Sequence, residues 1–172
     1  MTLEPHLEPD TTKLGETMSL RLSTREQTKA LGKVLGMTAP AGGMIALVGD
    51  LGAGKTTFTQ GFCEGIGGID PGTVTSPTFV LLQHYPGRLT VHHFDVYRLE
   101  SLDAFWDLGP NEYWEGDGVT LVEWADRVGL LLPSDRLQLV LTHSPDGGRE
   151  AQIQAMGTKH QEWLKKAKRN GL

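Results

Sequence analysis

The pattern of hydrophobic and polar positions predicts strands interspersed with helices. The run 44–48 is apolar throughout, which is typical of a strand buried on both faces of a parallel sheet. The run 119–122 is predicted to be another apolar strand. Strands are predicted at residues 19–22, 44–48, 79–84, 89–97, 119–122, 136–142 and 150–156. Pro86-Gly87 predicts a hairpin turn between the third and the fourth.

Helical periodicity appears between and after these strands. Phe58, Phe62 and Ile66 recur at i, i+4 and i+8, and the glycines that follow at 67 and 68 end that helix. Helices are predicted at 24–35, from about 55 to 66, at 101–108 and at 158–169, with one or two helical turns at 125–132. Capping patterns mark three of the starts: Ser23 with Glu26, Ser101 alone, and Thr158 with Gln161.

This mixture predicts an α/β fold with a mixed, mostly parallel central sheet flanked by helices. The domain is expected to span 18–157, preceded by an acidic, proline-containing arm at 1–17 that we expect to be disordered. A basic helix and tail, 158–172, follows. Its cations either touch tRNA or an acidic partner or form a solvated helix face, and we favour the solvated face. They are Lys165, Lys166, Lys168 and Arg169.

Composition narrows the functional classes. The chain has 172 residues, 38 % of them hydrophobic and 22 % charged, which suits one folded domain. Its net charge of −5 argues against a surface that binds nucleic acid as a whole. The single cysteine, Cys63, excludes an intrachain disulfide and favours a reducing compartment. Because no apolar segment resembles a signal peptide or a membrane span, we expect a cytoplasmic protein without a membrane partner.

One motif carries specific chemistry. The pattern G-x-x-x-x-G-K-T occupies 49–56 between an apolar strand and a helix, the context of a phosphate-binding P-loop. Its glycines let backbone N–H groups face an anion, Lys55 can reach the β- and γ-phosphates, and Thr56 can bind Mg²⁺. The fold is therefore predicted to be that of a single-domain P-loop NTPase. The predicted nucleotide-binding residues of the loop are Asp50, Leu51, Gly52, Ala53, Gly54, Lys55, Thr56 and Thr57.

Two carboxylates are candidates for the metal and water chemistry that a P-loop NTPase needs. Glu123 directly follows the predicted strand 119–122, so it reaches the edge of the sheet where ligands of α/β proteins bind. Asp95 shares one strand face with His93 and Tyr97. We predict that Glu123 binds the metal and that Asp95 binds metal or orients water. A structural salt bridge or cap remains the alternative for each carboxylate.

The loop Ser76-Pro77-Thr78 carries hydroxyl groups after the P-loop helix. It is similar to a switch segment that senses the γ-phosphate, and a plain Ser/Thr turn is the alternative. A histidine metal site is not expected, because the neighbours His92 and His93 face opposite sides of a strand.

The nucleotide is predicted to be ATP. A guanine-specific N-K-x-D motif is excluded, since neither Asn111 nor Asn170 precedes a lysine. A small-molecule or nucleoside kinase is one alternative, although Arg98 and Arg127 are the only arginines placed to neutralise a transferred phosphoryl group. A non-hydrolysing ATP-binding module that regulates assembly is another.

Four motifs in order carry a family resemblance. They are Gly49 to Thr57 (GDLGAGKTT), Ser76 to Phe79 (SPTF), His93 to Arg98 (HFDVYR) and Glu123-Trp124. This series resembles the bacterial TsaE (YjeE) family over roughly 20–156, which leaves the arm outside the family core.

The resemblance implies an activity and partners. TsaE-like proteins bind and slowly hydrolyse ATP with Mg²⁺, and they act with the TsaD and TsaB proteins to place threonylcarbamoyladenosine at adenosine 37 of tRNA. tRNA would then be contacted only through that complex. The same resemblance implies that Lys55 binds phosphate, that Thr56 and Glu123 bind Mg²⁺, and that Asp95 supports hydrolysis. Thr78 would lie in the switch-like loop, and Trp124 beside the nucleotide.

Overall fold

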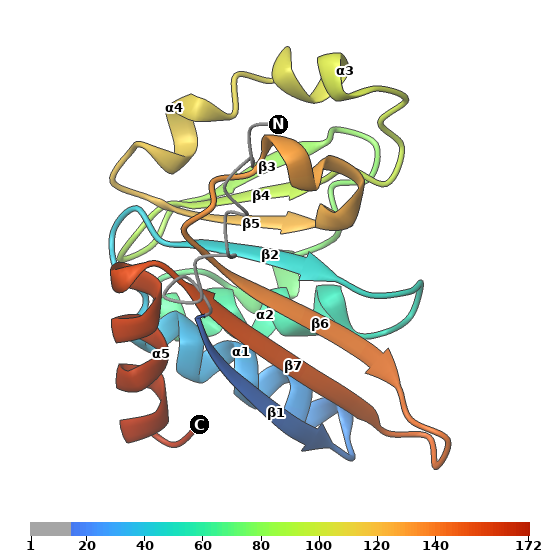
Figure 1. Ribbon diagram of the computed structural model, residues 1–172, viewed down its shortest axis with the longest axis vertical. Helices are drawn as coiled ribbons and strands as arrows, with labels where there is room; N and C mark the ends of the chain where they lie inside the picture. The colour runs from blue at the N-terminus through green and yellow to red at the C-terminus, as the bar shows by residue number, and fades with distance from the viewer. Residues whose placement is uncertain (1–14) are drawn as a thin grey trace, which may run out of the picture.

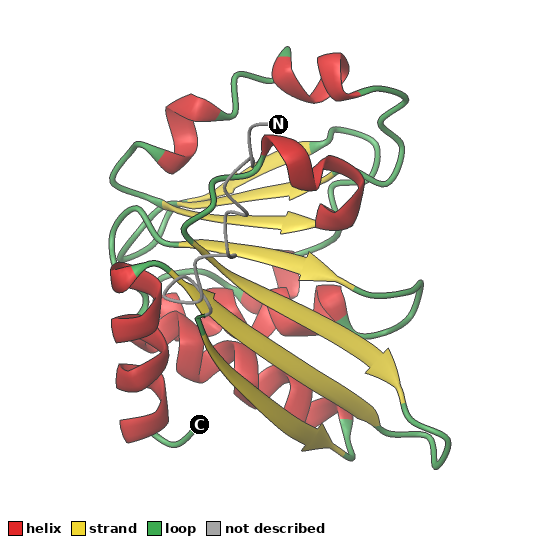
Figure 2. Cartoon of the chain, in the orientation of Figure 1, coloured by secondary structure: helices red, strands yellow, loops and turns green. Residues whose placement is uncertain are grey.

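A seven-stranded sheet forms the centre of the molecule in the computed structural model, which describes residues 15–172 (Figures 1 and 2). The strand order is β1-β7-β6-β2-β5-β4-β3. The four strands β6, β2, β5 and β4 are parallel, while β1–β7, β7–β6 and β3–β4 pair antiparallel. The predicted mixed sheet is confirmed, with three parallel and three antiparallel strand pairings. The strands are β1 Glu16–Leu22, β2 Met44–Val48, β3 Leu82–Tyr85, β4 Val91–Asp95, β5 Val119–Glu123, β6 Arg136–His143 and β7 Arg149–Met156.

Helices cover the sheet unequally. Three long helices, α1 Arg25–Thr38, α2 Lys55–Ile66 and α5 Thr158–Arg169, enclose the larger hydrophobic core, with α1 and α2 behind the sheet in Figure 1. A smaller core packs under short elements near β4 and β5. These are α3 Leu102–Trp106, α4 Asn111–Trp114 and the 3₁₀ segment η3 Ala125–Leu131; a further 3₁₀ turn, η2 Pro71–Thr73, follows α2. Within residues 15–172, no helix combines the length and apolar character that crossing a membrane requires.

The backbones of α1 and α2 touch directly. A Cβ added at Gly32 of α1 would lie 2.2 Å from the Phe58 carbonyl oxygen of α2. One added at Gly61 would lie 2.0 Å from the Lys29 carbonyl oxygen of α1. Only glycine permits so close an approach. The helix that starts at the P-loop is therefore fixed against its neighbour without intervening side chains.

Strand β2 occupies the position that its sequence predicts. It pairs in parallel with β5 on one side and β6 on the other, and both of its faces are covered. A strand buried on both faces reads as a continuous apolar run. The P-loop leaves its carboxyl end, at the right of β2 in Figure 1, and leads directly into α2.

Several predicted boundaries were wrong. Helix α1 is capped by Thr24, whose hydroxyl accepts from the Gln27 N–H at 3.2 Å, while the Gln27 side chain accepts from the Ser23 N–H at 2.6 Å. The capping pair is thus one residue later than Ser23 with Glu26. The helix also runs on to residue 38, beyond the predicted end at 35. Helix α5 is preceded by Gly157 at φ 81°, with no side-chain cap, so the Thr158–Gln161 box is wrong. Ser101 does cap α3, accepting from the Ala104 N–H at 3.1 Å.

Two strand limits also differ from the prediction. The segment before β3 is a turn, closed by a hydrogen bond from the Leu81 N–H to the Pro77 carbonyl, and Leu81 itself adopts φ 66°. Strand β3 therefore starts at 82 rather than 79, and β4 spans 91–95 rather than 89–97. Strand β1 begins at Glu16, inside the expected arm, and the Lys168 ammonium pairs with that carboxylate. The disorder expected for 1–17 otherwise concerns residues outside the described chain.

Helix α5 is part of the main core rather than an appendage. Its buried face contributes Trp163, Leu164 and Ala167, and the Trp163 indole N–H donates to the Leu35 carbonyl of α1 at 3.1 Å. The His160 Nε2 accepts from the Met44 N–H, the first residue of β2, at 3.1 Å. A neutral imidazole thereby joins α5 to the strand that leads to the P-loop.

This imidazole predicts a dependence of stability on pH. Burial lowers the pKa of His160 from 6.5 to about 4. The unfolded chain takes up the proton on His160 near pH 6.5, whereas the folded chain takes it up only near pH 4. The free energy of unfolding is therefore fully retained above pH 6.5 and falls by about 3 kcal/mol as the pH drops from 6.5 to 4. Urea unfolding of the wild type and His160→Gln between pH 7.5 and 4 measures this difference. Identical pH dependence in the two proteins would contradict the prediction.

Candidate functional site

The P-loop adopts a conformation that only its glycines allow. A Cβ at Gly49 would lie 2.5 Å from the Leu141 carbonyl oxygen of β6. Gly52 and Gly54 have φ values of 76° and 108°, in the left-handed region that side chains disfavour. The Ala53 N–H donates to the Asp50 carbonyl at 3.0 Å and closes the turn. The loop delivers the chain to the N-terminus of α2, where unpaired N–H groups form an anion-binding end.

Lys55 is folded into the site. Its side chain is buried, with a residue exposure of 5 %. The ammonium donates to the carbonyl oxygens of Gly49 and Asp50, and it lies 3.9 Å from the centre of the Trp124 ring. Burial lowers the pKa of Lys55, and the nearby Glu123 carboxylate opposes that shift. The Lys55 side chain thus folds back and places its positive charge beside the P-loop.

Trp124 forms one wall of the site by virtue of an unusual backbone. Its φ of 60° and ψ of 36° are left-handed, which costs free energy for a residue other than glycine. This turn ends β5 directly after Glu123 and lays the indole against the Tyr97 ring, with 4.7 Å between ring centres. The strained Trp124 therefore lies in the turn between β5 and η3, with its ring beside Lys55.

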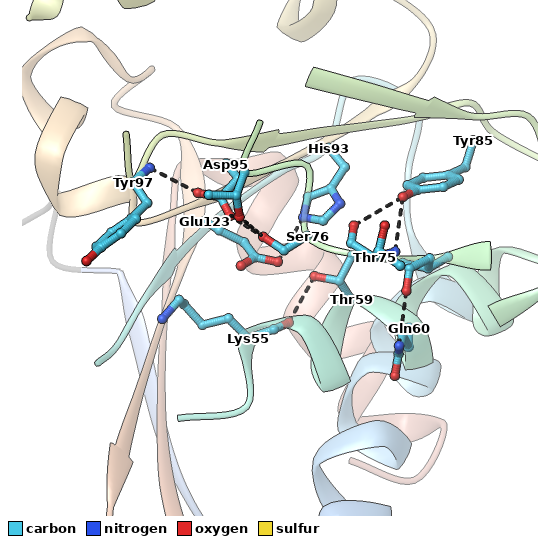
Figure 3. Close-up of polar contacts among 12 residues, drawn as sticks. Lys55, Thr59, Gln60, Thr75, Ser76, Tyr85, His93, Asp95, Tyr97 and Glu123 are labelled. Carbon is cyan, nitrogen blue, oxygen red and sulfur yellow. Dashed lines mark hydrogen bonds and ion pairs between the residues drawn. The ribbon is translucent and has the colours of Figure 1, made fainter. Parts of the chain in front are cut away.

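Asp95 is attached to the hydroxyl-bearing loop. Its Oδ2 accepts from the Ser76 hydroxyl, while its Oδ1 accepts from the Tyr97 N–H at 3.0 Å (Figure 3). The same Oδ2 also accepts from the Thr78 hydroxyl at 3.0 Å. The two hydroxyls lie 3.1 Å apart. The loop that we compared with a switch segment is therefore held by one buried carboxylate of the site. That contact distinguishes it from an isolated Ser/Thr turn.

Glu123 is the last residue of β5 and is 2 % exposed. Its Oε1 lies 2.9 Å from the His93 Nε2 of the neighbouring strand β4. A structural hydrogen bond to His93 is thus present, yet Glu123 also lines a cavity beside the P-loop. His93 and Asp95 share a strand face as predicted, while Tyr97 lies beyond the end of β4. The other histidine, His92, instead meets His84 across the β3–β4 pair, with their Nδ1 atoms 2.8 Å apart.

A cavity of about 340 Å³ brings most of the predicted residues together. Asp50 and Ala53 are the exceptions: they take part through backbone atoms, and the Ala53 side chain is buried elsewhere. Arg98 and Arg127 also lie outside the cavity lining. The lining residues are Leu51, Gly52, Gly54, Lys55, Thr56, Thr57, Ser76, Thr78, Asp95, Tyr97, Glu123 and Trp124.

The donor groups in this cavity fit magnesium. Thr56 contributes a hydroxyl, and Glu123 and Asp95 contribute carboxylates, which are the oxygen ligands that Mg²⁺ prefers. Within residues 15–172, no cluster of three or more histidine, cysteine or acidic side chains is arranged to hold a metal alone. Such a set suits a cation that takes its remaining ligands from phosphates and water.

A second hollow, of about 200 Å³, lies beside the first. Gly52, Gly54 and Thr57 line both, so the two spaces meet over the P-loop. Sequence reasoning missed the remaining lining residues, which come from the end of β1, the start of α1, the β6–β7 turn and the first residue of β7. No local motif marks them, because only the fold brings these segments to the loop. They include Thr24, Arg25, Thr28, Gly148 and Arg149.

Comparison with known proteins gives a consistent result. The sequence model of the family described as "Threonylcarbamoyl adenosine biosynthesis protein TsaE" matches residues 22–151. A Bacillus subtilis protein named "tRNA threonylcarbamoyladenosine biosynthesis protein TsaE" is 46 % identical over 137 residues, which cover 79 % of this chain and 84 % of that protein. A Treponema pallidum protein of the same name is 42 % identical over 128 residues, covering 74 % and 93 %.

Structural similarity extends over nearly the whole chain. The crystal structure of Bacillus subtilis YdiB superimposes with a TM-score of 0.75 at 36 % identity, covering 92 % of this chain and 98 % of that one. The family model spans all four motifs singled out in the sequence. The chain belongs to the TsaE family of threonylcarbamoyl adenosine biosynthesis proteins.

Proposed function

We propose that this protein binds and hydrolyses ATP with Mg²⁺ in the biosynthesis of threonylcarbamoyladenosine in tRNA, as a partner of TsaD and TsaB. One observation carries the proposal: Lys55, Thr56, Asp95 and Glu123 line a single cavity at the P-loop. The names of the relatives in B. subtilis and T. pallidum support the pathway. The motif and the cavity support the nucleotide.

The phosphate tail would lie along the P-loop. The N–H groups at the start of α2 would face its phosphates there, and the Lys55 ammonium can exchange two carbonyl partners for phosphate oxygens. Thr56 and Glu123 would hold Mg²⁺, which neutralises charge on the phosphates. The second hollow, which meets the cavity at Thr57, would take the adenosine.

Asp95 would act on the attacking water. Its carboxylate is 2 % exposed and lies in the cavity, where it can accept a proton from water or orient it towards phosphorus. The Ser76 and Thr78 hydroxyls now bond to its Oδ2. A water or metal contact at that oxygen would compete with them. Occupation of the nucleotide site would thus change how the 76–79 loop is held.

This competition suggests how the partner proteins would sense the nucleotide. Phe79 and Val80 follow the attached hydroxyls and are 82 % and 63 % exposed, which is unusual for large apolar side chains. They move with the loop if its bonds to Asp95 change. ATP would favour docking to the TsaD–TsaB complex, through which tRNA is reached, and hydrolysis would release or reset the complex.

The two alternatives differ from this proposal in their requirements. A small-molecule kinase needs free cations over the transferred phosphoryl group. Arg127 instead donates to the Tyr97 and Leu99 carbonyls, and the Arg98 guanidinium lies 4.4 Å from the Phe79 ring centre. ATP turnover that rises sharply with one small acceptor, and without partners, would favour the kinase. A non-hydrolysing module would retain full tRNA modification after Asp95→Ala.

Lys55→Ala is expected to weaken nucleotide binding severely. The change removes the charge that faces the phosphates and weakens affinity by roughly a hundredfold. Calorimetric titration with Mg-ATP measures it. Lys29→Ala, which removes an exposed lysine paired with Glu64, is the matched control. An affinity of Lys55→Ala within twofold of wild type would argue against the proposed site.

Asp95→Ala and Glu123→Ala should impair hydrolysis more than binding. Loss of a group that orients water or holds the metal costs about 10²–10⁴-fold in rate, whereas the loop and Lys55 still bind phosphate. Phosphate release and ATP affinity are measured in parallel, with TsaD, TsaB and tRNA present. Asp70→Asn, in the η2 cap outside the cavity, is the control. Equal losses in rate and affinity would contradict the assigned roles.

Docking should depend on the nucleotide. The protein is expected to retain TsaD and TsaB better with ATP than with ADP or without nucleotide, because the 76–79 loop responds to the γ-phosphate. A pull-down under the three conditions tests this, and mass spectrometry of tRNA nucleosides with and without the protein tests the pathway. Equal yields in all three conditions would refute nucleotide gating.

A further inference from the structure

Arg149 joins the β6–β7 turn to the P-loop. It is the first residue of β7, and its guanidinium reaches the outer side of the loop. The Nε donates to the Ala53 carbonyl at 3.1 Å, and one terminal nitrogen donates to the Gly52 carbonyl at 3.0 Å. The planar guanidinium of Arg149 is therefore hydrogen-bonded to two consecutive peptide groups of the P-loop.

The rest of the guanidinium is bound to its own turn. The other terminal nitrogen donates to the Gly147 and Gly148 carbonyls, each at 3.1 Å. None of the ion pairs among residues 15–172 involves Arg149. The Arg149 guanidinium is thus bonded to backbone carbonyls of the P-loop and of the β6–β7 turn, and not to a carboxylate.

The bonded carbonyls belong to peptide groups whose N–H atoms point the other way. The Gly52 carbonyl shares a peptide plane with the Ala53 N–H, which closes the turn on Asp50. The Ala53 carbonyl shares a plane with the N–H of Gly54, the left-handed residue just before α2. A cation on a carbonyl holds the peptide plane and makes the opposite N–H a stronger donor.

We propose that Arg149 is a positioning residue for the phosphate tail, acting through the P-loop peptides that it holds from outside. The inference deepens the proposed function and rests on it. A guanidinium suits this contact because its Nε–H and terminal N–H donors lie in one plane at a fixed spacing, whereas a lysine ammonium is a point charge on a flexible stem. Arg149 would set the affinity for phosphate without touching phosphate.

The test must separate this action from a direct contact with the nucleoside, because Arg149 also lines the second hollow. Inorganic triphosphate has the phosphate tail of ATP and no adenosine. An arginine that acts through the P-loop affects both ligands equally, whereas an arginine that contacts the base or the ribose affects only ATP.

Calorimetric titrations with Mg-ATP and with Mg-triphosphate are made on wild type, Arg149→Gln, Arg149→Lys and Arg21→Gln. Arg21 contacts Ser144 and Asp146 of the same turn but does not reach the P-loop, so its variant controls for damage to the turn. Arg149→Gln is expected to weaken the affinity for both ligands by about tenfold, because the P-loop loses hydrogen bonds from a charged donor. Arg149→Lys should weaken both by a smaller factor, and Arg21→Gln should stay within twofold of wild type.

Two results overturn the inference: unchanged affinities in Arg149→Gln, or a loss confined to ATP. If Arg149→Gln does not fold, the same two criteria apply to Arg149→Lys. Failure of the wild type to bind either ligand overturns the proposed function and the inference with it. Binding by the wild type with unaltered affinity in the Arg149 variants overturns the inference alone.

Discussion

The site depends on the register of three parallel strands. Leu47 of β2 pairs with Glu123 of β5, and Glu123 pairs with Asp95 of β4. This register places the two carboxylates side by side, one strand away from the exit to the P-loop. A slip of β5 by one residue would turn Glu123 to the opposite face of the sheet. The buried, apolar strands hold the register, so the hydrophobic core of the sheet determines the geometry of a polar site.

Burial of opposite charges is the second condition. Lys55, Asp95 and Glu123 are each almost fully covered, and isolated buried charges are costly. Each has partners: carbonyls and an indole for the lysine, hydroxyls and an N–H for Asp95, and His93 for Glu123. These contacts satisfy the charges, yet several of the partners are exchangeable hydroxyls and carbonyls. A ligand that offers phosphate oxygens or a cation can therefore replace them.

Much of this arrangement could be predicted from sequence, and the failures have local causes. The P-loop, Lys55, Thr56, Asp95 and Glu123 stand in motifs or at strand ends, where pattern and position indicate chemistry. The caps of α1 and α5 were misplaced because Ser23 and Thr24 are equivalent candidates by pattern, and because a glycine precedes Thr158. Arg149 carries no local signal at all. Its partners lie 96 and 97 residues away, and only the antiparallel β6–β7 pair brings it to the loop.

The contact between α1 and α2 limits how the molecule can respond to a ligand. Because Gly32 and Gly61 allow main chain to rest on main chain, there is no layer of side chains along which α2 could shear or roll. Helix α2 is then held rigidly, by its backbone contact with α1 along its side and by the P-loop at its start. A ligand-dependent change is therefore expected in segments held by side-chain hydrogen bonds, such as the loop bonded to Asp95. In the proposed reaction, a rigid helix beside a releasable loop would convert a change at the bound phosphates into a change at the surface, without a rearrangement of the sheet.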